Sequence, residues 1–135
     1  MRAMLSVLPL ILAAGCATSA SNETRLHVQQ KEAARLDAIL AGFTPGTPVT
    51  CLPSQDVRGP EAYGENVLLF RVGQNLIYRS TPHGSCRGVG RGEALITRHF
   101  TGRMCSGDIT RTANLTAGVE TGSCVLGDFV PYRRR

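Results

Sequence analysis

The sequence predicts a mainly β domain of the α+β class, in which one N-terminal helix precedes a small antiparallel barrel or sandwich. A helical pattern of apolar residues over 23–42 is followed, after Gly46, by short β-rich segments that glycine and proline separate. Four cysteines lie among these segments, and an even number is typical of a small exported domain held by disulfides. The 135 residues leave room for one such domain with a modest core.

Residues 1–15 have the three-part layout of a secretory leader. Met1 and Arg2 give a positive start, an apolar stretch follows over 4–14, and small residues end it. This stretch is too short for a membrane span, which needs about 20 apolar residues. The segment Leu12-Ala13-Ala14-Gly15-Cys16 resembles the lipobox of bacterial lipoproteins, in which the cysteine thiol is acylated and a peptidase cleaves before it. The alternatives are an ordinary leader with an incidental cysteine and an uncleaved core helix.

Residues 1–15 are therefore expected to be a lipoprotein signal peptide, and Cys16 is expected to carry the lipid. One acyl chain holds a protein on a bilayer only reversibly, whereas two or more hold it stably. Residues 16–22 are expected to form the lipid anchor and a short polar spacer. Ala17-Thr18 lacks the aspartate that retains the enterobacterial lipoproteins it resembles on the inner membrane, which favours the periplasmic face of the outer membrane.

A helix is predicted over 23–42, at the start of a single domain that occupies 23–135. Leu36, Ile39, Leu40 and Phe43 fall on one helical face, which Leu26 and Ala33 continue toward its start. The opposite side carries acidic as well as basic residues, so it is not the basic face that anionic lipid selects. Packing against the following domain is the expected use of the apolar face.

Seven short strands are predicted between 48 and 130. The segment 48–53 is bracketed by prolines, as expected of an edge or first strand. The segments 67–72 and 76–80 are separated by Gly73-Gln74-Asn75, which favours a hairpin. The remaining candidates are 94–100, 108–112, 115–119 and 124–130. A basic tail over 131–135 completes the chain.

Two disulfides are expected among Cys51, Cys86, Cys105 and Cys124. A structural zinc site usually brings its ligands in close C-x2-4-C pairs, whereas the nearest of these cysteines are 19 residues apart. Of the three pairings, we favour Cys51 with Cys124 and Cys86 with Cys105, which would join the first strand to the last and close the middle of the domain.

Several motifs resemble a family of small, uncharacterised lipoproteins from Alphaproteobacteria of the sphingomonad type. They are AGFTPGTPVTCLP, IYR, ITR, CSGDI and GSCVLGDFVPYRR, and the resemblance runs from about Leu36 to Arg134. It implies a helix followed by a β domain with paired cysteines. It supplies no activity and no catalytic residue.

Residues of the types found in catalytic sites are scattered along the chain. His99 and Asp108, with Ser106 or Ser123, supply the residue types of an acyl-transfer triad, but no G-x-S-x-G elbow surrounds either serine. The three histidines have no paired spacing, which argues against a metal site, and no cofactor is expected. The glycines of 88–92 lack the G-x-G-x-x-G spacing and predict a mobile loop. Asp108 and Asp128 each follow a glycine and are expected to accept backbone hydrogen bonds in turns.

The net charge is +5, and Arg133, Arg134 and Arg135 place three cations at the end of the chain. This end is a possible binding site for anions such as lipid headgroups, lipopolysaccharide phosphates or peptidoglycan carboxylates. The alternative is a solubilising tail. Nucleic acid is excluded by the expected location.

The sequence thus favours a lipid-anchored, non-enzymatic envelope module that binds another envelope protein, peptidoglycan or lipopolysaccharide. The alternatives are a small periplasmic hydrolase and an inhibitor of lysozyme. A basic inhibitor would repel a basic enzyme, which disfavours the last.

Overall fold

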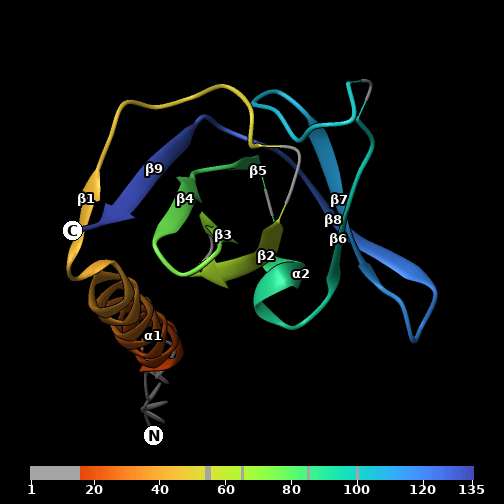
Figure 1. Ribbon diagram of the computed structural model, residues 1–135. Helices are drawn as coiled ribbons and strands as arrows, with labels where there is room; N and C mark the ends of the chain where they lie inside the picture. Colours follow the sequence, from red (N-terminus) through yellow and green to blue (C-terminus); the bar gives the residue numbers. More distant parts are fainter. Residues whose placement is uncertain (1–15, 54–55, 65, 85, 100) are drawn as a thin grey trace, which may run out of the picture.

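The structure is a computed structural model that describes residues 16–53, 56–64, 66–84, 86–99 and 101–135, with side chains from residue 21 onward. Its elements are α1 (Cys16–Leu40), β1 (Phe43–Pro45), β2 (Val57–Tyr63), β3 (Val67–Val72), β4 (Leu76–Ser80), β5 (His83–Gly84), α2 (Arg87–Gly90), β6 (Ala94–Thr97), β7 (Ile109–Asn114), β8 (Val119–Val125) and β9 (Phe129–Arg134), as Figure 1 shows.

The strands form two antiparallel sheets that pack as an open, sandwich-like β domain. The large sheet has the order β1-β9-β4-β3-β2, and the small sheet has the order β5-β8-β7-β6. The chain passes from the large sheet to the small one after β4 and returns after β8. This architecture confirms the predicted fold class, a helix followed by a mainly β domain.

The main core lies between the two sheets. Phe70 and Phe129 of the large sheet are fully buried and meet edge to face, with ring centroids 5.7 Å apart. Cys124 of β8 belongs to the same buried cluster, and Leu95 of β6 packs against it. The other face of the large sheet carries a second, smaller cluster, in which Leu36 of α1 covers apolar residues of β2, β3 and β4.

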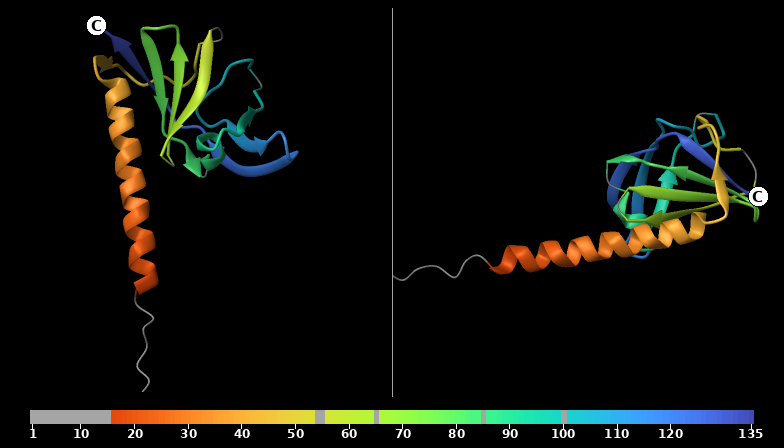
Figure 2. Two further views of the ribbon diagram at one scale, coloured as in Figure 1. Left: turned by 90° about the horizontal axis from the view of Figure 1, so that it is seen from below. Right: turned by 90° about the vertical axis from the view of Figure 1, so that its left-hand side faces the viewer.

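Helix α1 covers this face only with its C-terminal end. Leu36 is buried, but Leu26 is 57% exposed, so the predicted apolar face does not continue toward the start of the helix. Its 25 residues span about 37 Å at 1.5 Å per residue. Five strands spaced about 4.8 Å apart make a much narrower sheet. Figure 2 shows the helix projecting beyond the domain, and we call its exposed part, residues 21–35, the stalk.

The hairpin of β3 and β4 has the bounds that the sequence predicts. The other predicted strands differ from the structure, and three of them differ in kind rather than in their ends. Residues 115–118 form the turn between β7 and β8, where Asn114 accepts a hydrogen bond from the Ala117 N–H at 3.0 Å. The predicted strand 124–130 divides between β8 and β9. The segment 48–53 makes only isolated bridges, at Val49 and Cys51, because the flanking prolines cannot donate to a ladder.

Four elements of the structure were not predicted: the short strands β1 and β5, strand β2 and the helical turn α2. Strand β2 contains Gly59 and Pro60, which argue against a strand, and its pairing with β3 shifts register between Arg58 and Glu61. The irregularity accommodates the two residues within the ladder. The glycine-rich loop of 88–92 begins with the single helical turn α2, so its first part is an ordered element. Helix α1 itself begins at Cys16 and includes the expected spacer.

The two disulfides are confirmed, but the favoured pairing is wrong. The bridges join Cys51 to Cys105 and Cys86 to Cys124. Cys51 and Cys105 face each other in an isolated antiparallel bridge, with Cα atoms 4.0 Å apart. Cys86 lies next to α2, which packs on the small sheet that contains Cys124. The favoured pairing assumed that Cys124 belongs to the last strand, whereas it lies on β8.

Candidate functional site

The outer face of the small sheet exposes two isoleucines and two arginines. Ile96 and Arg98 come from β6 and the residue after it, and Ile109 and Arg111 come from β7. We call these four residues the Ile–Arg face. Ile96 and Ile109 are 43% and 64% exposed, and exposed apolar side chains that gather on one face, unlike single ones, mark an interaction surface.

Strand alternation directs these residues outward. In β7, Thr110 and Thr112 point into the sandwich and are fully buried, so Ile109 and Arg111 point away from it. Thr110 is held there by a hydrogen bond from its hydroxyl to the Cys124 carbonyl at 3.1 Å. Ile96 pairs with Arg111 across the ladder, so an isoleucine and an arginine are direct neighbours on adjacent strands of this face.

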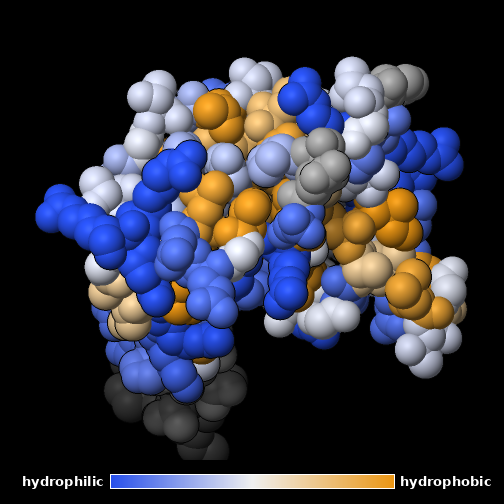
Figure 3. All heavy atoms as spheres, viewed as in Figure 1, coloured by the Kyte–Doolittle hydropathy of each residue, from blue (hydrophilic) through white to orange (hydrophobic). Residues whose placement is uncertain are grey.

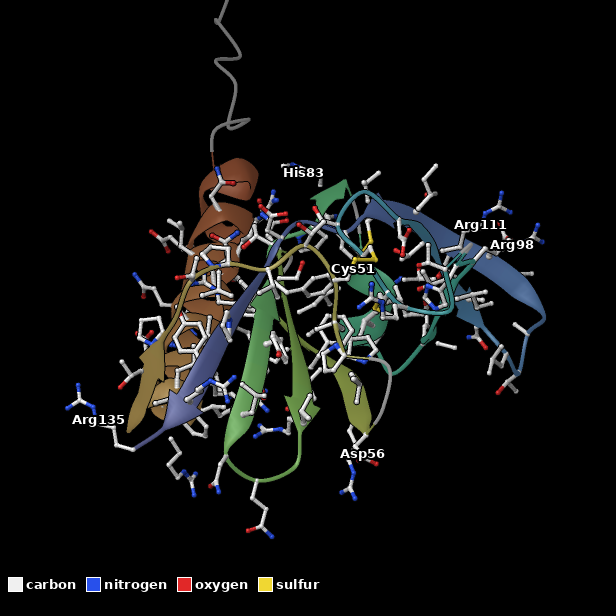
Figure 4. All side chains as sticks on the ribbon, turned by 45° about the horizontal axis from the view of Figure 1, so that its top comes forward. Cys51, Asp56, His83, Arg98, Arg111 and Arg135 are labelled. Carbon is white, nitrogen blue, oxygen red and sulfur yellow. A yellow bond between two sulfur atoms is a disulfide. The ribbon has the colours of Figure 1, made fainter. Side chains whose placement is uncertain are left out.

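A hollow of about 470 Å³ lies on the Ile–Arg face. Asp108 and Glu120 contribute two carboxylates to its lining. Arg111 is paired with Glu120 at 2.9 Å, whereas the side chain of Arg98 makes no hydrogen bond or ion pair within the described ranges. Figure 4 shows Arg98 and Arg111 projecting from the same side of the small sheet. The face therefore combines apolar surface with an unpaired guanidinium.

The hairpin between β7 and β8 extends the apolar surface. Leu115 and Val119 at its tip are both exposed, Leu115 by 73%. Figure 3 shows apolar side chains gathered over β6, β7 and β8. Most of the exposed large apolar residues in the described part of the chain thus belong to the small sheet and its hairpin.

His99 and Asp108 lie together at the end of this sheet. The His99 Nδ1 atom is 3.4 Å from Asp108 Oδ2, and the same carboxylate oxygen accepts the Cys105 N–H at 2.7 Å. The second contact confirms the predicted turn role of Asp108. Asp128 makes no such bond in the described residues, so the same prediction is wrong for Asp128.

Ser106 and Ser123, the two serines that could complete the triad, are not hydrogen-bonded to His99 in the described residues. Ser123 donates its hydroxyl to the Thr110 carbonyl at 3.2 Å. Because an acyl-transfer triad needs contact between nucleophile and base, this arrangement is not assembled in the structure.

The arginines at the end of the chain are part of the fold. Strand β9 includes Arg133 and Arg134, which corrects the prediction of a free tail over 131–135. The Arg134 guanidinium lies 4.8 Å from the centroid of the Phe43 ring, and Arg135 donates to the Thr44 hydroxyl at 2.9 Å. All three arginines stay exposed at the edge formed by β1 and β9.

A charged cluster on the large sheet was missed because β2 was not predicted. Arg71 donates twice to the Glu61 carboxylate, at 2.6 and 3.2 Å, and the Tyr63 hydroxyl donates to it at 2.9 Å. The hydrogen bond from Arg71 lowers the pKa of Glu61. Burial and the adjacent Glu61 raise the pKa of Tyr63. Arg35 of α1 stacks on the Tyr63 ring at 5.5 Å, so the cluster joins the helix to the sheet.

The expected leader, residues 1–15, lies outside the described residues, as does the side chain of Cys16. Among the described helices, none combines the length and the apolar character that a membrane crossing requires. His27 lies on the stalk and His83 in β5.

Comparison of the chain with known protein families, with curated proteins and with solved structures found no match. The class that the structure defines is therefore a broad one: an open β sandwich with one N-terminal helix and two disulfides. The disulfides indicate an extracytoplasmic domain, because thiols are kept reduced in the cytosol of most organisms.

Proposed function

We propose that the protein is a lipid-anchored, non-enzymatic binding module on the periplasmic face of the bacterial outer membrane. The lipobox resemblance and the resemblance to small alphaproteobacterial lipoproteins support acylation at Cys16. Helix α1 begins at this residue, and its polar, exposed stalk suits a spacer between lipid and domain.

The Ile–Arg face is the observation that carries the binding role. The buried centre of a protein interface is richer in apolar surface and in arginine than the rest of the protein surface, and the Ile–Arg face offers both. An envelope protein with apolar and acidic side chains fits this face. The carboxylates of peptidoglycan and the phosphates of lipopolysaccharide would pair with the arginines, but these polar polymers would leave Ile96 and Ile109 without an apolar partner. The exposed Arg133, Arg134 and Arg135 form a second cationic edge for anionic envelope components.

Two variants test the binding role. Ile109→Ser and Arg98→Glu are expected to abolish capture of a defined partner from envelope extract while the fold is retained, because both side chains are exposed. Arg58→Glu is the matched control, since Arg58 is exposed on β2 of the large sheet and does not line the hollow of the Ile–Arg face. Capture that survives both substitutions on the Ile–Arg face, or is lost equally in the control, contradicts the proposal.

The anchor is tested separately by intact-mass measurement of the native protein. A diacyl or triacyl mass on a chain that begins at Cys16 is expected, and Cys16→Ser is expected to release the protein from the membrane fraction. An unmodified N-terminus contradicts the anchor without affecting the binding role.

A small hydrolase is the second candidate, and only the His99–Asp108 contact favours it. His99→Gln and Asp108→Asn separate the two functions. A binding module keeps its partner and its cellular phenotype in the His99 variant, whereas a hydrolase that depends on this pair loses activity. Asp108→Asn also weakens the turn at Cys105, so the His99 variant is the decisive one.

A further inference from the structure

Arg79 of β4 is a partly buried arginine whose side chain has no partner. Its Nε atom is closed to solvent and makes no hydrogen bond, and within the described ranges no carboxylate lies at ion-pair distance of its guanidinium. Arg71 on the neighbouring strand shows the usual solution, a two-fold hydrogen bond to Glu61. A side-chain N–H withdrawn from water without an acceptor is unfavourable, and the terminal nitrogens of this partly exposed arginine also lack a protein acceptor in the described residues.

The sheet register explains why the protein leaves Arg79 unpaired. Arg79 pairs with Leu69 of β3 and with Val130 of β9, so its neighbours across the ladders are apolar. Its side chain lies on the face of the sheet that the end of α1 covers, because Ile77, two residues earlier, packs in the cluster with Leu36. The aliphatic part of Arg79 has suitable neighbours on this face, and the charged end does not.

Two hollows share Arg79 as a wall. One, of about 330 Å³, lies beside α1 and is also lined by Glu32 and Tyr63. The other, of about 340 Å³, lies away from the helix and is also lined by Thr81, His83 and Asp128. We call the second hollow the Arg79 pocket.

The charges around the two hollows distinguish them. Glu32 places a carboxylate in the first hollow, which opposes an anion there. In the Arg79 pocket the hydroxyl of Thr81 and the imidazole of His83 are both exposed, and both can donate hydrogen bonds. Asp128 is the acidic residue in this lining, but it is exposed and forms no ion pair with Arg79 or His83 in the described part of the chain.

We propose that the Arg79 pocket binds an oxyanion, a phosphate or carboxylate group. Such a group supplies the acceptor that the guanidinium lacks in the protein, and arginine binds both groups through two parallel hydrogen bonds. Thr81 and His83 line the same pocket and can donate further hydrogen bonds to the bound group. This site lies where the chain passes between the two sheets, and it shares no lining residue with the hollow on the Ile–Arg face. The group can come from a free anion or from the phosphodiester of a lipid headgroup.

The test measures binding to the full chain by titration with inorganic phosphate, dimethyl phosphate and acetate. The arginine Nε–H resonances of the NMR spectrum follow Arg79 directly, and the thermal midpoint provides a second readout. Phosphate is expected to shift the Arg79 Nε–H resonance and to raise the midpoint. Arg79→Met is expected to weaken binding by about tenfold or more, because a hydrogen bond to a charged group is lost.

Arg133→Gln is the control, since it removes the same charge from an exposed position of β9. If Arg79→Met fails to fold, His83→Gln and Thr81→Val alter two exposed lining residues of the pocket and are expected to weaken binding without affecting the core. Dimethyl phosphate binding as tightly as phosphate assigns the site to a lipid headgroup, and phosphate alone assigns it to a free anion. The proposal is overturned if none of the three anions shifts the Arg79 resonance, or if the Arg133 variant loses as much affinity as the Arg79 variant.

Discussion

Removal of the disulfide between Cys51 and Cys105 measures how much this bridge contributes to the free energy of unfolding. The bridge closes a loop of 54 residues, and the chain-entropy model assigns such a loop about 4 kcal/mol of stabilisation. The bridge between Cys86 and Cys124 closes 38 residues, which gives nearly the same entropic value. Loop size alone therefore predicts equal losses for the two double-alanine variants.

The two disulfides differ in burial, so the two variants are expected to lose different amounts of stability. Cys86 and Cys124 are both buried in the core cluster between the sheets, whereas Cys51 and Cys105 are partly exposed. Replacing the buried pair with alanine leaves a cavity where two sulfur atoms packed, which adds about 2 kcal/mol at about 1 kcal/mol for each methyl-sized void. The variant Cys86→Ala/Cys124→Ala is therefore expected to lose about 6 kcal/mol, and Cys51→Ala/Cys105→Ala about 4 kcal/mol.

Urea unfolding followed by far-ultraviolet circular dichroism measures both losses without reductant, and the chain has no tryptophan to use instead. Non-reducing peptide mapping of the parent protein checks the pairing itself. Equal losses in the two variants would refute the argument from burial. A loss below about 1 kcal/mol for the partly exposed pair would refute the argument from loop size.

Three further predictions concern the packing and the charged cluster. Leu36→Ala is expected to cost about 2–5 kcal/mol in urea unfolding because Leu36 is the buried contact of α1, whereas Leu26→Ala on the stalk stays within about 0.5 kcal/mol. Glu61→Gln is expected to lower stability at neutral pH, since the hydrogen bond from Arg71 holds the pKa of Glu61 below its ordinary value of 4.5. That stabilisation is present above pH 4.5 and is lost as the pH falls through the folded pKa, so the two unfolding curves should converge in acid; a difference that persists there contradicts the assignment. Phe43→Leu removes the ring beneath the Arg134 guanidinium and is expected to lower the free energy of unfolding by about 1 kcal/mol. Val49→Ala is the control, because it shortens an apolar side chain on an isolated bridge without touching this ring–cation contact.

The sequence predicts the elements whose signals are local. The hairpin of β3 and β4 follows from two apolar runs and a glycine-containing break, and both strands have the predicted bounds. Strand β2 could not be found in this way, because Gly59 and Pro60 argue against a strand and only pairing with β3 supports it. Pairing with β3 therefore determines that residues 57–63 form a strand, although their local sequence does not favour one.

The disulfide pairing and the candidate sites depend on the order of strands, which periodicity does not contain. Cys124 was placed on the last strand, and the boundary between β8 and β9 lies just beyond it. Arg79 also shows this limit. Its position in a β-rich run was visible in the sequence, but its lack of a partner depends on Leu69 and Val130, which lie beside it only in the folded sheet.

The length of α1 bears on how tightly the domain must bind. With an anchor at Cys16, a rigid rod of about 37 Å confines the domain to a shallow layer above the lipid. A partner embedded in the same membrane then meets it at a local concentration in the millimolar range. Encounters become frequent enough that a contact of modest strength keeps the two together, and either molecule can still exchange for another.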